Sequence, residues 1–346
     1  MIVPEGKRLI LDPRDEYTHP PEPFSNYNES MYFNGFDAEN PVGLWVRLGN
    51  RPNEGHAEMT VCVYLPDGSV GFMFRRVPIT NNDRMNAGGL TFEVVEPFEH
   101  LTIAYEGEVL WLKDPAAMMD PARAFKENPK RACRIRLDVH GVSPMHGGEI
   151  VEADGSRWDL DPDKEVFRGH TEQHTAVSGE LTVGDESWRI DGTGYRDKSW
   201  GPRHWQSFYH YKWAPITFGK DFGLLLSLMG NPAGAPIVVG HALRDGRLIP
   251  ITDATVSVDY DARYFQKAIR LRLTTDEEVY DVTAETFSLI PLRHRRTLRD
   301  GSTSTARITE GMVRYTCNGR AVWGMSEFLD LLVEGDKPIS VALETA

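Results

Sequence analysis

Cysteine is scarce in this chain, whose 346 residues include only Cys62, Cys133 and Cys317, far apart from one another. An odd number of isolated cysteines argues against a disulfide framework, and the lack of a CxxC pair argues against zinc held by cysteine. Reduced thiols are typical of the cytoplasm, which is where we expect the protein.

Positive charge is also limited, since 38 Lys and Arg stand against 51 Asp and Glu, for a formal net charge of -13. Nucleic-acid binding needs clustered basic side chains, so we expect no nucleic-acid partner. The apolar runs are too short to span a bilayer, and the first residues lack the apolar core of a signal peptide. We therefore expect no transmembrane segment.

Several catalytic motifs are missing as well. The sequence has no dinucleotide fingerprint, no phosphate-binding loop and no nucleophile elbow. These absences disfavour nucleotide and hydrolase chemistry, and we expect no cofactor.

The chain instead has many short segments in which apolar and polar residues alternate, a pattern typical of half-buried β-strands. In segment 58–65, for example, Met59, Val61 and Val63 fall on one face. Further strands are predicted over 70–74, 90–95, 100–105, 108–112, 133–139, 180–183, 187–190, 222–229, 237–243, 254–260, 268–274, 279–287 and 312–318, with a hairpin tip at 105–108. Helical patterns are limited to 114–125 and to 326–329, after a strand that begins at 322. Short strands at this spacing predict an all-β fold of barrels or sandwiches.

A polar, turn-rich connection at 152–165 predicts a domain boundary, which divides the chain into 1–160 and 161–346. Each part has about the length of one barrel of roughly eight to ten strands.

The densest constellation lies at 192–205, which reads Gly-Thr-Gly-Tyr-Arg-Asp-Lys-Ser-Trp-Gly-Pro-Arg-His-Trp. If this segment is extended, Tyr195 and Asp197 share one face. A carboxylic acid in an apolar pocket has a raised pKa and stays protonated, so Asp197 is a candidate acid for protonating an alkene. The alternative is a structural ion pair of Asp197 with Arg196 or Arg203.

Upstream, His170, Glu172 and His174 alternate with period two and would share one face of a strand. His170 is a candidate proton relay because imidazole titrates near neutrality, and we assign Glu172 and His174 to substrate hydrogen bonding. Two histidines and a carboxylate could also form an open metal face, but no further ligand cluster supports it, and we expect no metal.

Aromatic residues are concentrated around and after the motif. We assign Trp200, Trp205, Tyr209 and Trp213 to the lining of a pocket for an apolar substrate, together with Arg203. Ordinary barrel core is the alternative for each ring.

In the first half of the chain, we interpret the polar residues of glycine- and proline-rich segments as parts of turns and scaffolding. The alternative for Arg51 and Glu54 is that they shape the rim of the pocket. The residues concerned are Asn34, Asp37, Arg51, Asn53 and Glu54.

The motif at 192–205 resembles the signature of the carotenoid 1,2-hydratase/AttH-like superfamily, as do the segments 170–173, 308–315, 32–37 and 49–55. The resemblance covers most of the chain. It implies two lipocalin-like antiparallel β-barrels in tandem, 1–160 and 161–346, with the site motif in the second and the site where the barrels meet.

In the hydratases of that superfamily a Tyr-x-Asp step is thought to supply the catalytic acid, which Tyr195 and Asp197 match here. An upstream histidine of the hydratases is matched by His170 or His174. This sequence departs from the pattern at Lys198, where a histidine or another polar residue is expected, and at Pro202.

These observations favour a cofactor-independent lyase or isomerase, a hydratase, dehydratase or cyclase, that protonates an alkene in a hydrophobic terpenoid or lipid-like substrate. Asp197 would act as the acid, Tyr195 would assist, and His170 would orient water or take the final proton. The alternatives are a non-catalytic carrier of hydrophobic ligands and a pericyclase that folds a polyene. A homodimer is a further possibility.

Overall fold

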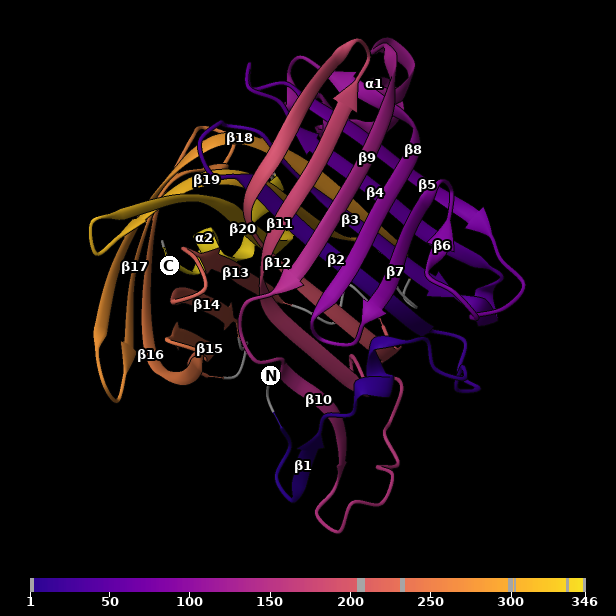
Figure 1. The fold of residues 1–346 in the computed structure, drawn as a ribbon, viewed down its shortest axis with the longest axis vertical. Coiled ribbons are helices and arrows are strands. Elements are labelled where there is room, and N and C mark those ends of the chain that lie inside the picture. Colours follow the sequence, from indigo (N-terminus) through magenta and orange to yellow (C-terminus); the bar gives the residue numbers. More distant parts are fainter. Residues whose placement is uncertain are drawn as a thin grey trace. The chain divides into compact units, whose positions relative to one another are not determined.

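The computed structural model describes residues 3–203, 209–230, 234–297, 301, 303–333 and 336–344. The fold is all-β and antiparallel, as the sequence predicts (Figure 1). The chain divides into two compact units. Unit 1 comprises residues 1–66, 71–111 and 129–204, and unit 2 comprises residues 67–70, 112–128 and 205–346.

The first sheet contains twelve strands among the described residues. They are β1 (Lys7–Ile10), β2 (Tyr27–Asp37), β3 (Gly43–Arg51), β4 (His56–Tyr64), β5 (Val70–Pro78), β6 (Asn86–Ala87), β7 (Leu90–Glu96), β8 (His100–Leu112), β9 (Lys130–Gly141), β10 (His146–Glu152), β11 (Gly169–Val183) and β12 (Glu186–Pro202). The order is β1-β10-β11-β12-β2-β3-β4-β5-β8-β7-β6, and β9 pairs with both β8 and β11. The path from β11 through β12, β2, β3, β4, β5, β8 and β9 therefore returns to β11 and closes a barrel.

Unit 2 contains the second sheet. Its strands are β13 (His210–Thr217), β14 (Phe222–Met229), β15 (Ile237–Arg244), β16 (Arg247–Tyr260), β17 (Gln266–Thr275), β18 (Val279–Thr297), β19 (Thr303–Cys317), β20 (Arg320–Val333) and β21 (Lys337–Pro338). Strand β13 pairs with both β14 and β20, so β13 to β20 form a closed antiparallel barrel (Figure 1).

The helices are short. They are the 3-10 helices η1 (Pro13–Glu16), η2 (Pro52–Glu54) and η3 (Pro115–Met119) and the α-helices α1 (Pro121–Glu127) and α2 (Ile339–Glu344). Helices η3 and α1 occupy the segment in which the sequence predicts helical turns. Among the described residues, no helix is both long and apolar enough to cross a membrane.

Side-chain alternation explains why the strands form and which way they face. In β9, Cys133, Ile135, Leu137 and Val139 are buried, and the residues between them are exposed. The other two cysteines, like Cys133, are free and buried. In unit 2, inward-facing apolar residues from neighbouring strands form one core, which includes Phe222, Leu273 and Tyr280.

The structure differs from the sequence-based predictions in three local features. Residues 105–108 lie inside the continuous strand β8 and form no hairpin tip. Residues 326–329 continue β20, because Phe328 alternates inward into the core. Asn34 and Asp37 lie in β2 and are buried, where the sequence suggested turns.

The division of the chain also differs from the one drawn at residue 160. Strands β11 and β12 follow that residue, yet they pair with β9, β10 and β2 in the first sheet. Backbone hydrogen bonding thus assigns the motif strand β12 to unit 1, whereas the sequence suggested the second half.

Candidate active site

Strand β12 presents two chemically different faces. In an antiparallel pair, directly opposed residues point to the same side of the sheet. Asp197 is opposed to Tyr32 on β2, and Lys198 is opposed to Met31. Tyr195, Asp197 and Ser199 therefore lie on one face, and Arg196, Lys198 and Trp200 lie on the other, since side chains alternate along a strand.

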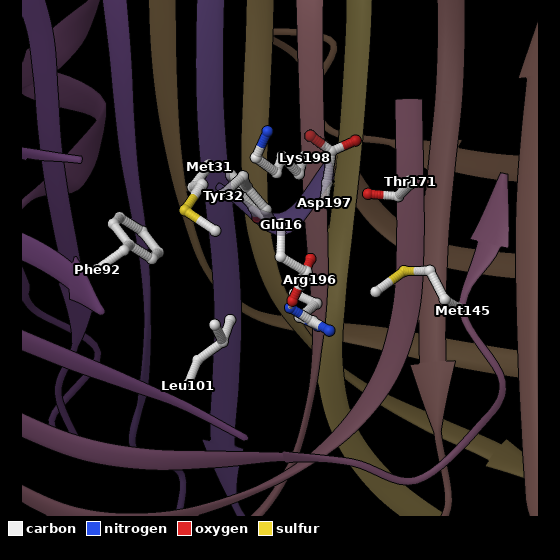
Figure 2. Close-up of a pocket in the computed structure, with 10 residues that line it drawn as sticks. All are labelled: Glu16, Met31, Tyr32, Phe92, Leu101, Met145, Thr171, Arg196, Asp197 and Lys198. Atoms are coloured by element: carbon white, nitrogen blue, oxygen red, sulfur yellow. Dashed lines mark hydrogen bonds and ion pairs between the residues drawn. The ribbon is translucent and has the colours of Figure 1, made fainter. Parts of the chain in front are cut away.

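The Arg196 face points into the barrel of unit 1. Met31 on β2 and Leu101 on β8 line the same pocket as Arg196, although β2 and β8 are not neighbours in the sheet. Side chains from strands on opposite sides of a ring meet in its interior. Figure 2 shows this pocket, with Glu16 of η1 beside Arg196, while the carboxylate of Asp197 points away from both.

Buried ion pairs fix this inner face. Arg196 Nη1 donates to Glu16 Oε2 at 2.6 Å, and Lys198 Nζ donates to Glu29 Oε1 at 2.7 Å. Lys198 is therefore remote from the face that carries Asp197. Trp200 also lies on the inner side, where its ring stacks on His19 with centroids 4.3 Å apart. The pocket-lining role that the sequence suggested for Trp200 beside Asp197 is incompatible with this placement.

The opposite face of β12 gathers the predicted polar residues. Strand β11 pairs with β12 without a register shift, which sets Glu172 opposite Asp197 and His174 opposite Tyr195. His170 lies two residues before Glu172 on the same face. The period-two pattern of the sequence is thus confirmed for both strands.

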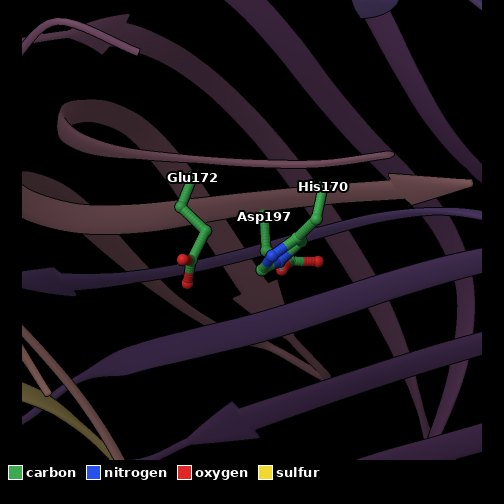
Figure 3. Close-up of side chains that lie close together, drawn as sticks. All are labelled: His170, Glu172 and Asp197. Carbon is green, nitrogen blue, oxygen red and sulfur yellow. Dashed lines mark hydrogen bonds and ion pairs between the residues drawn. The ribbon is translucent and has the colours of Figure 1, made fainter. Parts of the chain in front are cut away.

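His170 and Asp197 form the centre of this face. Nε2 of His170 is hydrogen-bonded to Oδ2 of Asp197, and the two side chains keep 18% and 23% of their surface exposed. Glu172 lies beside them, as Figure 3 shows, and one polar atom from each of the three side chains lies within 4.8 Å of the others. The group is partly shielded from solvent and still accessible.

The charge state of Asp197 differs from the one expected from the sequence. Burial alone would raise the pKa of its carboxyl group, but His170, Arg203 and Arg47 together hold it below its ordinary value of 3.8. Asp197 is therefore a carboxylate at neutral pH. The prediction of a protonated acid was based on apolar surroundings, whereas the structure surrounds this carboxylate with cations.

His170 carries the proton of this pair. Burial alone would lower the pKa of its imidazole, but the carboxylates of Asp197 and Glu172 outweigh that effect and raise the pKa above 6.5. Of the two arginines offered as alternative ion-pair partners of Asp197, Arg196 points into the barrel and pairs with Glu16. Arg203 remains close to the pair, and its Nη2 donates to Ser199 Oγ at 2.8 Å.

The other two imidazoles near the pair are neutral. Burial lowers the pKa of His174 to about 3, and the nearby His146 adds to this effect. Burial likewise lowers the pKa of His146 to about 4. The ring of His174 meets Tyr195 edge-on, with centroids 4.8 Å apart. Burial holds the pKa of Tyr195 well above 10.0, so the phenol keeps its proton.

Arg47, which acts on the charge of Asp197, was not singled out from the sequence. Arg47 on β3 is opposed to Tyr32 and lies 3.5 Å from Glu58, which also lies 3.6 Å from Arg51. A usable signal was present, because Trp45, Arg47, Gly49 and Arg51 alternate with the apolar residues of β3. Arg51 also pairs with Glu54 at 2.8 Å, so these two residues do lie together.

The other aromatic residues predicted to line the pocket are Trp205, Tyr209 and Trp213. Trp205 lies outside the described residues. Tyr209 and Trp213 belong to unit 2, where Trp213 packs against the cluster of Tyr211, Ile308 and Leu329.

His170, Glu172 and Asp197 have the side-chain types that hold divalent cations, and their ligand atoms are close enough to share one. Arg47 and Arg203, however, already balance the charge of Asp197. The arrangement is thus suited to proton transfer through a histidine–carboxylate pair.

Comparisons with known proteins agree with this fold. Residues 12–331 match the family described as domain of unknown function DUF7064. A Nitrosomonas europaea protein described as AttH is similar over 94% of this chain and 98% of that chain, at 14% identity and a TM-score of 0.60. Kievitone hydratase from Nectria haematococca is similar over 94% of this chain and 96% of that chain, at 11% identity and a TM-score of 0.50. A search of curated proteins finds no match.

Proposed function

Because the chain belongs to the DUF7064 family, a domain of unknown function, we propose its activity from the chemistry of the site. We propose a cofactor-independent hydro-lyase or isomerase that transfers a proton to the alkene of an apolar small molecule. The observation that carries this proposal is the hydrogen bond between His170 and Asp197, with Glu172 beside it.

Proton transfer would begin at His170. Its imidazolium gives a proton to one carbon of the alkene, and the other carbon becomes cationic. The carboxylate of Asp197 stabilises the imidazolium before this step and the developing cation during it. Asp197 is therefore an electrostatic partner in this proposal, and the role of acid moves to His170.

Glu172 completes the cycle. A water molecule that attacks the cation loses its proton to the Glu172 carboxylate, so that the net change is addition of H and OH across the double bond. The proton then returns to His170, whose imidazole is within the same group. The reverse sequence removes water, and loss of a carbon-bound proton from the cation instead gives an isomer.

The acid strength of imidazolium limits the substrate class. An imidazolium is too weak to protonate an isolated, unpolarised alkene at a useful rate. The proposed substrate therefore yields a tertiary, allylic or benzylic cation. Terpenoids and prenylated phenols contain such alkenes. The similarity in fold to a protein described as a kievitone hydratase supports water addition as one of the proposed reactions.

Tyr195 would supply a neutral hydrogen-bond donor beside the charged His170. It is fully buried on the same face as Asp197, and its phenol stays protonated at neutral pH. A protonated phenol can donate a hydrogen bond to a substrate oxygen or to the attacking water. His174 holds the ring of Tyr195 from the side and would act as a positioning residue.

The proposal is tested by deuterium incorporation. The protein is incubated in D2O with prenylated phenols and monoterpene alcohols, and the products are analysed by mass spectrometry. We expect incorporation of one carbon-bound deuterium, and a loss of about 100-fold or more in rate in His170→Gln. Binding without incorporation across the panel would favour the carrier hypothesis.

A metal-dependent reaction would give a different result. Elemental analysis of the purified protein and assays after treatment with EDTA distinguish the two chemistries. Activity that disappears with EDTA and returns with one divalent cation would contradict the proton-transfer mechanism.

A further inference from the structure

We propose that His100 and His140 bind one divalent transition-metal ion on the outer surface of unit 1, and that Cu²⁺ binds there most tightly. Neither histidine belongs to the proposed active site, so this proposal is independent of the proton transfer at His170. The two residues lie on strands β8 and β9. In β9 buried and exposed residues alternate, and Asp138 and His140 belong to the exposed set.

The strand register brings the two imidazole rings together. Strands β8 and β9 are antiparallel, and His100 is directly opposed to His140. Side chains at such positions project to the same side of the sheet, with Cβ atoms about 4.5–5.5 Å apart. The ring centroids lie 4.3 Å apart. Two nitrogens that share one ion lie at most about 4.2 Å apart, because each metal–nitrogen bond measures about 2.0–2.1 Å. The separation of the rings is thus close to the one that a shared ion requires.

Asp138 prepares one of the rings for a metal ion. Its Oδ1 lies 3.0 Å from Nε2 of His100. A carboxylate only accepts hydrogen bonds, so Nε2 carries the proton of the neutral ring and Nδ1 keeps its lone pair. Metal-binding histidines almost always donate their other N–H group to a carboxylate, a backbone carbonyl or water. Asp138 is therefore placed as the outer partner that fixes the tautomer of His100.

The site is open to solvent, so an ion can reach it without a cavity. The side chains of His100 and Asp138 are 25% and 58% exposed, and His140 is exposed as well. The two rings are stacked at an interplanar angle of 17°, so one ring must turn to direct its lone pair at a shared ion. His140 can make this turn because it lies on the exposed side of β9. Water would fill the remaining coordination positions.

The side-chain types determine which ion is bound. Imidazole nitrogens suit copper, nickel and zinc, whereas calcium and magnesium prefer oxygen ligands. The affinity of a nitrogen site for divalent ions of this series is highest for Cu²⁺. Glu96 of β7 is opposed to His100 and exposed, so two carboxylates, Glu96 and Asp138, offset the charge of the ion. We expect Cu²⁺ to bind more tightly than Ni²⁺ or Zn²⁺.

The two histidines are separate from the proposed active site. His140 is opposed to Ala176 of β11, which comes six positions after His170 on that strand. At about 3.3 Å per residue, this distance is roughly 20 Å along β11. The group of His170, Glu172 and Asp197 also has side-chain types that hold divalent cations. Binding is therefore measured in the His170→Gln variant, which removes the imidazole of that group.

The test is calorimetric titration of the full chain, carrying His170→Gln, with CuCl2. We expect one tightly bound ion per chain. The further change His140→Gln leaves one imidazole and should weaken binding by about 100-fold or more, because the second ligand no longer binds within the same molecule. Asp138→Asn keeps both imidazoles and should weaken binding by about tenfold. The matched control is His56→Gln, at a half-buried histidine of β4, a strand that pairs with neither β8 nor β9.

Electron paramagnetic resonance of the bound Cu²⁺ identifies its ligands. We expect the signals of two imidazole nitrogens, and of one after the change His140→Gln. Absence of binding, or an affinity that His140→Gln leaves unchanged, overturns the proposal, as does a spectrum with a single imidazole before that change. The thermal midpoint of each variant is measured alongside, so that a folding defect is not counted as a loss of binding.

Discussion

Lys198 Nζ lies 2.7 Å from Glu29 Oε1, with the lysine side chain 3% exposed and the glutamate side chain fully buried. The two residues are separated by 169 positions and join neighbouring strands, β12 and β2. Lys198 is one of the two positions at which the motif departs from the pattern that it resembles. The ion pair places the Lys198 side chain inside the barrel of unit 1. A lysine at this position therefore does not alter the face of β12 that carries Asp197.

Replacing Lys198 by methionine should destabilise the protein strongly. The variant leaves the carboxylate of Glu29 buried without its main cation, and breaking a buried pair in this way costs about 3–5 kcal/mol. Chemical denaturation of Lys198→Met measures the loss in unfolding free energy. Asp259→Asn, which removes one partner of the exposed pair with Arg270, is the control and should leave the midpoint nearly unchanged.

The paired variant sharpens this test. Lys198→Met combined with Glu29→Gln removes both charges and should recover part of the lost stability. A double variant that loses at least as much unfolding free energy as the two single variants lose together would contradict the account.

The stability of unit 1 should depend on the protonation of His19. Nδ1 of His19 lies 2.8 Å from Glu29 Oε1, and Nε2 lies 3.3 Å from Asp15 Oδ1. Burial alone would lower the pKa of His19, but these two carboxylates raise it above 6.5. A pKa that is raised in the folded state stabilises the fold fully at pH values below the unfolded value. This contribution is lost as pH rises through the folded pKa.

Unfolding free energies measured at intervals between about pH 6 and pH 9 provide the readout. The wild-type protein should lose stability over the part of this range that begins near the unfolded pKa of imidazole. The variant His19→Gln should show a smaller step, because His170, whose pKa is also raised, still contributes to it. A step of the same size in both proteins would assign it to another group.

The sequence was sufficient to predict much of the site strand. Alternation placed Tyr195 with Asp197, and His170 with Glu172 and His174, because the period of a strand is a local property. It also predicted the all-β fold, since alternating segments recur along the chain.

The identity of the partners is not a local property. The proton carrier of Asp197 lies 27 residues away, and Arg47 reaches its surroundings from two strands away in the sheet. Whether a carboxyl group is raised or lowered in pKa depends on such neighbours. The register of β11, β12, β2 and β3 brings these neighbours close to Asp197. The short motifs of the sequence do not reveal that register.

Replacing Asp197 by asparagine tests the role of its negative charge while the size of the side chain stays the same. The amide keeps the size of the side chain but removes the negative charge that raises the pKa of His170. We expect the imidazole pKa of His170 to fall and turnover to fall by about 10²–10⁴-fold. Side-chain NMR titration of the histidines measures the first change, and the deuterium assay measures the second.

The control for this experiment is Asp191→Asn, on the same strand. Asp191 has a side chain that is 69% exposed and lies beyond the site, so its neutralisation should change neither quantity. If Asp197→Asn retained full turnover, the histidine–carboxylate pair would have no catalytic role, even if the imidazole pKa shifted.

Trp200 offers a last test of the two-faced arrangement of β12. Gly169 of β11 is opposed to Trp200, and a Cβ atom at Gly169 would lie only 2.1 Å from the indole ring. The Gly169→Ala variant must therefore displace the ring, which stacks on His19 at an interplanar angle of 13°. Overpacking of this kind costs about 1–3 kcal/mol.

We expect lower stability and a changed near-ultraviolet circular dichroism of tryptophan in Gly169→Ala. Gly311→Ala is the matched control, since a Cβ atom at Gly311 would meet its nearest neighbour at an ordinary 3.5 Å. Because Trp200 lies on the inner face, any turnover should persist once the variant is folded. A loss of turnover equal to that of Asp197→Asn would place Trp200 at the reacting group and contradict the assignment of the two faces.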